Sequence, residues 1–255
     1  MHKVFAKPLF LGKKVLFLTE CHSTNDELLQ LVKKNDPIEG TIVYTDYQTN
    51  GKGQRGNVWF SERGKNLLFS VLVKPTYVEV SKQFLLNVAM GLGVVKCMSR
   101  HVSKASLPCL KWPNDIYVAD KKVGGILIEN LVKSHLIDAS VVGIGVNLNQ
   151  SAFVNPMATS VKMITGSEVN SLQFLEELLI DIEFYLMKLK NRKEKELMET
   201  YYSSMYKLGE VANYKDEIGS FEGIIRGVDN HGRLIIEKDG VNCTYSIKEV
   251  EFLGD

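Results

Sequence analysis

The residues best suited to chemistry lie in a glycine-rich, cationic stretch, GKGQRGN, from Gly51 to Asn57. Apolar, strand-like runs precede it at Thr41–Tyr44 and follow it at Leu67–Val73, so we expect a loop that joins two strands. Glycine lets a ligand approach the backbone closely. Exposed backbone N–H groups beside Lys52 and Arg55 would suit an anion, above all a phosphate.

Two familiar glycine motifs do not fit this loop. A P-loop needs Gly-Lys-Ser/Thr leading into a helix, and a dinucleotide fingerprint also needs a helix directly after the glycines. Here the loop leads to Trp59, Phe60 and a strand. Because glycine and basic residues are common in turns, a surface loop with incidental charge is the alternative.

A second dense segment runs from Cys109 to Asn130. Its apolar runs at Ile116–Val118 and Ile126–Ile128 predict paired strands around a polar turn. This pairing would bring together Lys111, Asn114, Asp115 and Lys122. The alternative is that Asn114-Asp115 forms an ordinary turn and both lysines are solvated.

Two further sites complete the set of candidates. Ser23 or Thr24 can begin a helix, either as a cap alone or also as a hydrogen-bond donor to a ligand. Gly143 and Gly145 alternate inside a predicted strand, which often marks the close approach of a ligand or of another backbone. Asn147 then lies at the end of that strand.

The elements that must position these residues follow from periodicity. Strands are expected at 15–18 and 136–148, and helices from Ser23 onward, over 81–102 and as one long helix over 171–202. A coiled coil is the alternative for the last of these, but its apolar stripe is short. After Tyr206, short strands with regular glycines predict a small β-barrel.

Composition excludes several classes of protein. The chain has 255 residues, 45% hydrophobic and 24% charged, and a formal net charge of +1, which argues against a dedicated nucleic-acid binder. Its four cysteines are widely spaced, so neither a structural zinc site nor a disulfide scaffold is indicated, and a cytoplasmic setting fits best. No membrane span or signal peptide is predicted.

Four ordered stretches resemble the motifs of biotin protein ligases, also called biotin–[acetyl-CoA-carboxylase] ligases or holocarboxylase synthetases. They are GKGQRGNVW at 51–59, KWPND at 111–115, KVGGILIE at 122–129 and GIGVN at 143–147. Four motifs in this order make the resemblance specific. It runs from about residue 15 to the end of the chain.

The resemblance implies a two-step, ATP-dependent reaction. The biotin carboxylate attacks the α-phosphate of ATP, giving biotinyl-5′-AMP and pyrophosphate, and a lysine of a biotin carboxyl carrier protein then displaces AMP. Because an anion attacks a polyanion, cations, N–H donors and Mg²⁺ are expected to offset the repulsion. The glycine-rich loop would cover the labile adenylate and exclude water.

The resemblance also implies roles for individual residues. Those expected to bind biotin are Ser23, Thr24, Gln48, Gly51, Lys52, Gly53, Gln54, Arg55, Lys122, Gly125, Gly143 and Gly145. Those expected to bind ATP are Lys52, Gln54, Arg55, Trp59, Lys111, Asn114, Asp115 and Asn147. Lys122 and Arg55 are the expected catalytic residues, and Asp115 is the expected metal ligand.

The loop departs from the family pattern. Many bacterial members have GRGRRGR, whereas here Lys52, Gln54 and Asn57 replace arginines, so electrostatic retention of the adenylate should be weaker. The chain begins close to the catalytic region and is near neutral, so no operator binding and no nucleic-acid partner are expected. A homodimer is left open.

The expected fold is α+β. A central mixed β-sheet backed by helices, as in the class II synthetase-like catalytic domain of biotin and lipoate ligases, would occupy residues 1–207, and an SH3-like β-barrel residues 208–255. A lipoate or octanoate ligase of the same fold is the alternative function, although its arginine- and histidine-bearing motif is not found. A non-enzymatic small-molecule or RNA-binding module built on the C-terminal barrel is disfavoured because that region lacks a basic aromatic face.

Overall fold

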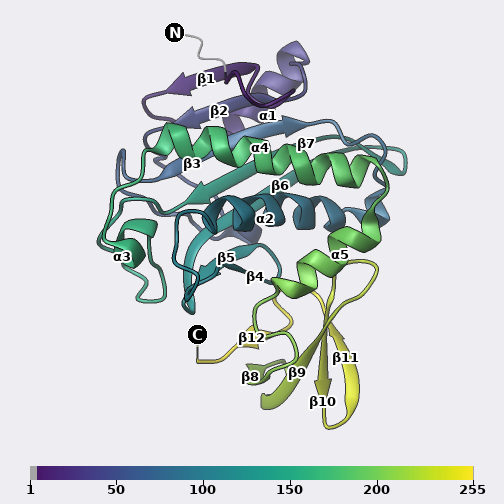
Figure 1. The fold of residues 1–255 in the computed structure, drawn as a ribbon. Helices are drawn as coiled ribbons and strands as arrows, with labels where there is room; N and C mark the ends of the chain where they lie inside the picture. The colour runs from purple at the N-terminus through teal and green to yellow at the C-terminus, as the bar shows by residue number, and fades with distance from the viewer. Residues whose placement is uncertain (1–4, 255) are drawn as a thin grey trace.

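The computed structural model describes residues 5–254, with the side chain of Arg55 excepted. Two β-sheets organise this part of the chain: a seven-stranded sheet and, below it in Figure 1, a five-stranded sheet formed by the C-terminal residues. The predicted α+β class, with a central mixed sheet backed by helices, is confirmed.

The large sheet has the order β1-β2-β3-β7-β6-β5-β4. Strands β1 and β2 are parallel and the other neighbours are antiparallel, so the sheet is mixed. Its strands are β1 (Lys14–Leu18), β2 (Thr41–Thr45), β3 (Leu67–Val73), β4 (Cys109–Lys111), β5 (Asp115–Val118), β6 (Lys121–Lys133) and β7 (Leu136–Val146). Strands β3 and β7 are buried along most of their length, which explains their near-continuous apolar runs.

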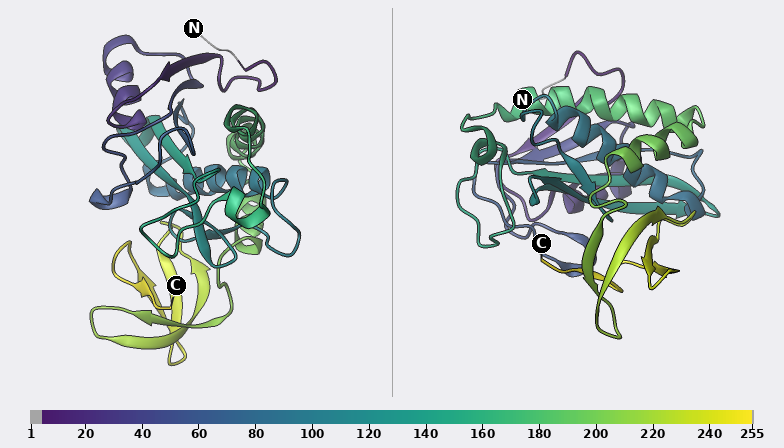
Figure 2. Two further views of the ribbon diagram at one scale, coloured as in Figure 1. Left: turned by 90° about the vertical axis from the view of Figure 1, so that its left-hand side faces the viewer. Right: turned by 60° about the horizontal axis from the view of Figure 1, so that its bottom comes forward.

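Helices cover both faces of this sheet (Figure 2). Helix α1 (Thr24–Asn35) packs on β2, β3 and β7 over a small apolar cluster around Leu28, Val43 and Leu72. Helix α2 (Phe84–Met98), preceded by a 3₁₀ turn at Val80–Lys82, packs on the opposite face together with α4. The alternation of side chains along each strand divides the core in this way.

The prediction of one long helix over 171–202 is wrong. The chain forms α4 (Ser171–Lys190) and α5 (Glu194–Ser203), separated by a turn in which Arg192 has a φ of 56°. A left-handed residue ends a helix because it turns the chain out of the helical path, and the N–H groups of Arg192 and Lys193 close this end by donating to the Leu189 and Lys188 carbonyls, each at 3.0 Å. The break directs α5 along α2 toward the small sheet. A short helix, α3 (Val161–Thr165), was not anticipated.

The C-terminal sheet is antiparallel, in the order β11-β10-β9-β8-β12. Its strands are β8 (Val211–Lys215), β9 (Ser220–Val228), β10 (Leu234–Lys238), β11 (Val241–Tyr245) and β12 (Glu251–Phe252). The turn after β9 docks onto the large domain. The indole nitrogen of Trp112 donates to the carbonyl of Gly232 at 2.8 Å, and a Cβ at Gly232 would lie 2.2 Å from Phe84.

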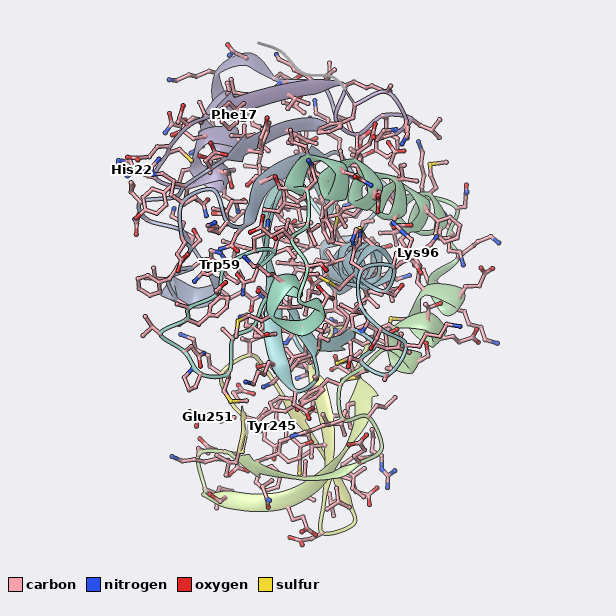
Figure 3. The ribbon with its side chains drawn as sticks, turned by 60° about the vertical axis from the view of Figure 1, so that its left-hand side comes forward. Phe17, His22, Trp59, Lys96, Tyr245 and Glu251 are labelled. Carbon is pink, nitrogen blue, oxygen red and sulfur yellow. The ribbon has the colours of Figure 1, made fainter. Side chains whose placement is uncertain are left out.

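The helices within residues 5–254 are too short or too polar to cross a membrane. Figure 3 locates six labelled side chains on the molecule. Trp59 and His22 lie on one side, Lys96 lies on the other, and Tyr245 and Glu251 mark the small domain below.

Candidate functional site

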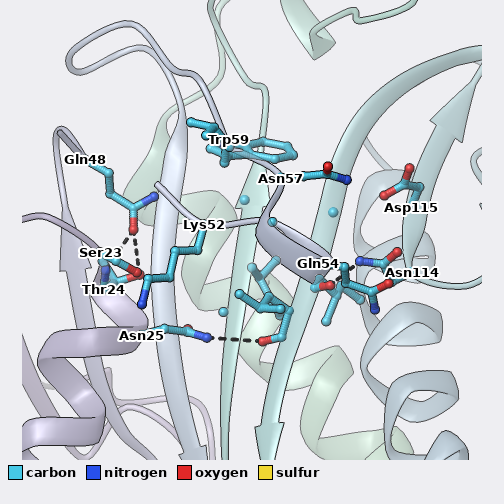
Figure 4. A pocket seen from close by; sticks show the side chains of 18 of the residues that line it. Ser23, Thr24, Asn25, Gln48, Lys52, Gln54, Asn57, Trp59, Asn114 and Asp115 are labelled. Carbon is cyan, nitrogen blue, oxygen red and sulfur yellow. Dashed lines mark hydrogen bonds between the residues drawn. The ribbon is translucent and has the colours of Figure 1, made fainter. Parts of the chain in front are cut away.

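A cavity of about 230 Å³ lies on the face of the large sheet that α1 covers, beside the first turn of that helix (Figure 4). Its walls come from the start of α1, the glycine-rich loop with Gln48 before it, Phe69 on β3, the β4–β5 corner, the paired strands β6 and β7, and the turn after β11. Segments that are far apart in the sequence therefore meet at one cavity. This is the arrangement that the ordered motifs predicted.

One end of the cavity is lined by hydrogen-bonding groups. The Oε1 atom of Gln48 accepts from the backbone N–H of Thr24 at 2.8 Å and lies 3.1 Å from the Thr24 hydroxyl. Ser23 is the N-cap residue of α1, but its side chain makes no capping hydrogen bond. Capping alone therefore does not explain Ser23, whose side chain lines the cavity.

The glycine-rich loop closes on itself as a small flap over the cavity. Gly53 N–H donates to the Asn57 carbonyl at 2.7 Å, and Trp59 N–H donates to the Gly51 carbonyl at 2.8 Å. Lys52 forms an ion pair with Asp26, in the first turn of α1, at 2.5 Å. The side chain of Arg55, an expected catalytic residue, lies outside the described part of the structure.

The indole of Trp59 lies against the floor of the cavity. A Cβ added at Gly145 would be 2.7 Å from its ring, and one at Gly125 would be 3.2 Å away. Its Nε1 atom is buried and has no hydrogen-bond partner among the described residues. A buried N–H without a partner is costly, so this group is a candidate donor to a bound molecule.

Lys122 and Asp115 face each other across the strands β5 and β6. The ammonium nitrogen of Lys122 is 2.6 Å from Oδ1 of Asp115 and 5.7 Å from the centre of the Trp59 ring. The backbone of Lys122 is fixed on its other side by hydrogen bonds with Met157 and Thr159 at 2.7 and 2.9 Å. The predicted hairpin thus delivers a firmly held cation to the cavity.

The glycines at 143 and 145 leave room for the protein's own side chains. A Cβ at Gly143 would lie only 2.3 Å from Oδ1 of Asn25, and the Trp59 ring occupies the corresponding space over Gly145. We expected these glycines to let a ligand reach the backbone. Both do line the cavity, but the close contact that requires each glycine comes from a neighbouring side chain.

Three expected site residues lie away from the cavity lining within residues 5–254. Lys111 turns toward the small domain, with its Nζ 3.2 Å from the Tyr117 hydroxyl and 4.6 Å from the Phe252 ring centre. Gly51 packs against the backbone of Trp59. Asn147 is buried and donates to the Thr159 carbonyl at 3.0 Å, so it supports the segment that fixes Lys122.

The structure also adds residues that the sequence did not indicate. Ile247 and Lys248, from the turn after β11, line the cavity although they belong to the small domain. No local pattern marks them, because their place depends on how the two sheets dock. Asn25 could have been noticed, since it directly follows Ser23 and Thr24, and Asn57 had been noticed only as the replacement of a family arginine.

A second group with metal-binding side chains lies elsewhere. Cys97, His101 and Glu177 converge between α2 and α4. Burial raises the pKa of the Cys97 thiol far above its usual value, and this thiol lies 3.8 Å from the Phe174 carbonyl. A thiol that stays protonated is a poor metal ligand. We therefore interpret these three side chains as packing contacts between the two helices. At the cavity, Asp115 is the carboxylate suited to a hard cation.

Comparison with known proteins agrees with this geometry. A model of the Biotin/lipoate A/B protein ligase family matches residues 18–147. The bifunctional ligase/repressor BirA of Escherichia coli (strain K12) is 30% identical over 242 residues, which cover 90% of this chain and 71% of that protein. The biotin–[acetyl-CoA-carboxylase] ligase of Paracoccus denitrificans is 28% identical over 93% of this chain and 100% of its own length.

Solved structures give the same result. The biotin protein ligase from Aquifex aeolicus in complex with biotin and ATP superposes with a TM-score of 0.77 and 30% identity, covering 93% of this chain and 97% of that one. The family model spans the flap, the β4–β5 corner and the lysine hairpin, all of which wall the cavity. This chain belongs to the Biotin/lipoate A/B protein ligase family.

Proposed function

We propose that this chain is an ATP-dependent biotin–[acetyl-CoA-carboxylase] ligase, which activates biotin as biotinyl-5′-AMP and transfers it to a lysine of a biotin carboxyl carrier protein. The observation that carries the proposal is one cavity that holds a hydrogen-bonding end at Thr24 and Gln48 and a fixed cation at Lys122. The Aquifex aeolicus structure reported above is a complex with biotin and ATP.

The two ends of the cavity suit the two ends of biotin. The ureido head carries N–H donors and a carbonyl acceptor, which match the hydroxyl and amide groups of Ser23, Thr24 and Gln48. The carboxylate at the other end would reach Lys122, whose charge favours an anion and the phosphate joined to it. Trp59 would cover the apolar chain between them.

In the first step a carboxylate oxygen of biotin bonds to the α-phosphorus of ATP, and the bond to the β-phosphate breaks, releasing pyrophosphate. Negative charge grows on the phosphate oxygens, where Lys122 and the flap N–H groups would stabilise it. In the second step the carrier lysine amine attacks the acyl carbon, its proton is lost and AMP departs. The flap and Trp59 would exclude water meanwhile.

The residues present fit a magnesium ion shared with the substrate. Mg²⁺ is usually held by one or two carboxylates together with substrate phosphates. Asp115 lines the cavity beside Asn114, and both offer oxygen atoms. When bound there, the ion would neutralise phosphate charge. Asp115 pairs with Lys122, so that carboxylate is held where it can serve either partner.

Several finer points belong to the same proposal. We take residues 1–207 as the catalytic domain and 208–255 as the C-terminal domain. The four cysteines are free, which supports a reducing cytoplasmic setting. The net charge of +1 supports the absence of a nucleic-acid partner. A gel-shift assay with specific, salt-sensitive DNA binding would overturn that last point.

The decisive experiment supplies the purified chain with ATP, Mg²⁺, biotin and an apo-carrier protein. Biotin transfer to the carrier, dependent on ATP, is expected. A folded protein that transfers no biotin would refute the proposal. Calorimetry with biotin and with lipoate separates the alternative ligase, because lipoate has no ureido group to engage Thr24 and Gln48.

A further inference from the structure

A chain of buried polar side chains runs beneath the hydrogen-bonding end of the cavity. The Ser70 hydroxyl on β3 lies 2.7 Å from the Thr24 hydroxyl and 2.6 Å from Oδ1 of Asn25. The amide nitrogen of Asn25 lies 2.7 Å from a carboxylate oxygen of Glu129 on β6. Thr24, Asn25 and Ser70 are at most 4% exposed. Buried polar groups of this kind must satisfy one another.

Glu129 sets the orientation of Asn25. An ionised carboxylate can only accept hydrogen bonds, so the atom of Asn25 that faces it must be the nitrogen. The Leu127 carbonyl, 3.4 Å from the same nitrogen, adds a weaker preference for this orientation. The Oδ1 atom of Asn25 therefore faces Ser70. The absence of a side chain at Gly143 makes room for it there.

The orientation of Asn25 then fixes the donor and the acceptor in each of the next hydrogen bonds, because each hydroxyl has only one proton to donate. Ser70 has a single hydroxyl proton, and its 2.6 Å contact with an amide oxygen requires that proton. The remaining short contact, 2.7 Å between the two hydroxyls, must therefore take its proton from Thr24. The reverse direction would leave two acceptors 2.6 Å apart in a buried site, which is strongly unfavourable.

Thr24 is left with lone pairs only. Its longer, 3.1 Å contact with Oε1 of Gln48 has no proton to share, and Gln48 is satisfied instead by the Thr24 backbone N–H. A hydroxyl whose proton is already committed can only accept from a bound molecule. The end of the cavity at Thr24 thus selects an N–H donor.

We propose that Glu129 is a positioning residue, which through Asn25 and Ser70 makes the Thr24 hydroxyl a fixed acceptor for an N–H group of the biotin ureido head. The proposal rests on the proposed function in that it names the ligand group. The direction of the chain is a property of the protein by itself. The two can therefore be tested apart.

The test exchanges the carboxylate and the amide in the hydrogen bond between Glu129 and Asn25. Asn25→Asp places a second carboxylate against Glu129, so either repulsion or protonation must disturb the chain. The double variant Asn25→Asp/Glu129→Gln restores one donor and one acceptor, with the direction toward Ser70 unchanged. Glu129→Gln alone tests the carboxylate: a glutamine can still accept from Asn25 but no longer forces the Asn25 nitrogen to face it, so the loss of biotin affinity should be smaller than for Asn25→Asp.

Each variant is measured for thermal stability without ligand, for biotin Kd by calorimetry, and for KM of biotin and of ATP by pyrophosphate release. We expect Asn25→Asp to weaken biotin binding by about tenfold or more, the worth of one lost hydrogen bond. The KM for ATP should stay within about twofold. The double variant should return to within about threefold of wild type, short of full recovery because the Leu127 carbonyl loses its donor.

The outcomes separate the two claims. If the wild type does not bind biotin, the proposed function fails. The stability measurements alone then test the direction of the hydrogen bonds: Asn25→Asp should lower the thermal stability, and the double variant should restore it. If the double variant matches Asn25→Asp in both biotin affinity and thermal stability, the proposed direction of the hydrogen bonds is wrong. Equal loss for biotin and ATP would show a purely structural role and would overturn the positioning claim.

Discussion

The ammonium nitrogen of Lys122 lies 2.6 Å from the carboxylate of Asp115, on the wall of the cavity. Both side chains are partly exposed, so their attraction contributes little to folding stability. Its effect is on placement, because each group is held at the cavity before a substrate arrives. An arriving carboxylate and phosphate would compete with Asp115 for the lysine, while a metal ion would compete with the lysine for Asp115.

Replacing Lys122 with methionine should reduce adenylate formation by about 10²–10³-fold, since the change removes one charged donor from a developing oxyanion. Methionine keeps an unbranched side chain of similar length, so the fold should be retained. Biotin-dependent exchange of pyrophosphate into ATP measures the first step alone. Lys111→Met is the matched control. Its lysine turns toward Tyr117 and Phe252, and it should affect this exchange much less.

Gly143→Ala should destabilise the fold by about 1–3 kcal/mol, because the new methyl group would overpack against Asn25, 2.3 Å away. Chemical denaturation measures the change. In the background of Asn25→Ala the same substitution should cost much less, since the clashing atom is gone. Additive effects in this double-mutant cycle would contradict the packing explanation.

Trp112→Phe should lower stability by about 1–3 kcal/mol, because the Gly232 carbonyl would lose its buried donor at 2.8 Å. The chain's other tryptophan offers a control. Trp59 has a buried indole nitrogen with no partner among the described residues. Trp59→Phe therefore replaces the indole with a smaller ring without breaking a hydrogen bond. Equal losses for the two variants would show that ring volume, rather than the hydrogen bond, is what matters.

Cys21 should resist alkylation near neutral pH although it neighbours Gln48. Burial, partly opposed by a hydrogen bond with Thr45, raises the pKa of this thiol to about 11, so at pH 8 about one thousandth of it is the reactive thiolate. The rate with iodoacetamide, read at Cys21 by mass spectrometry, should rise about tenfold per pH unit toward pH 11. Fast modification at pH 8 in folded protein would contradict this assignment.

Much of the scaffold followed from the sequence because its signals are local. Apolar runs marked the central strands, and the alternation of glycine with cations marked the flap between β2 and β3. The helix break at Arg192 was missed, since a basic residue gives no sign that it will adopt a φ of 56°. Local backbone hydrogen bonds close that turn, from the Arg192 N–H to the Leu189 carbonyl and from the Lys193 N–H to the Lys188 carbonyl, and no residue type signals them.

The sequence predicted the site residues that belong to recognisable motifs. It did not predict the residues whose place depends on how a side chain is oriented or how the two domains dock. Ser23, Thr24 and Lys122 line the cavity as expected, because their strands and helix point them there. Lys111 lies outside the lining because its side chain meets the Phe252 ring of the small domain, a contact between residues over a hundred positions apart. Lys248 was missed for the same reason.

The turn that carries Ile247 and Lys248 makes the small barrel part of the active-site wall. A barrel transplanted from a relative, or trimmed away to obtain a minimal enzyme, would therefore leave the pocket open to solvent along one side, however well the larger half folds. Anyone redesigning this protein for shortened size or altered nucleotide preference has to treat those two residues as part of the catalytic half.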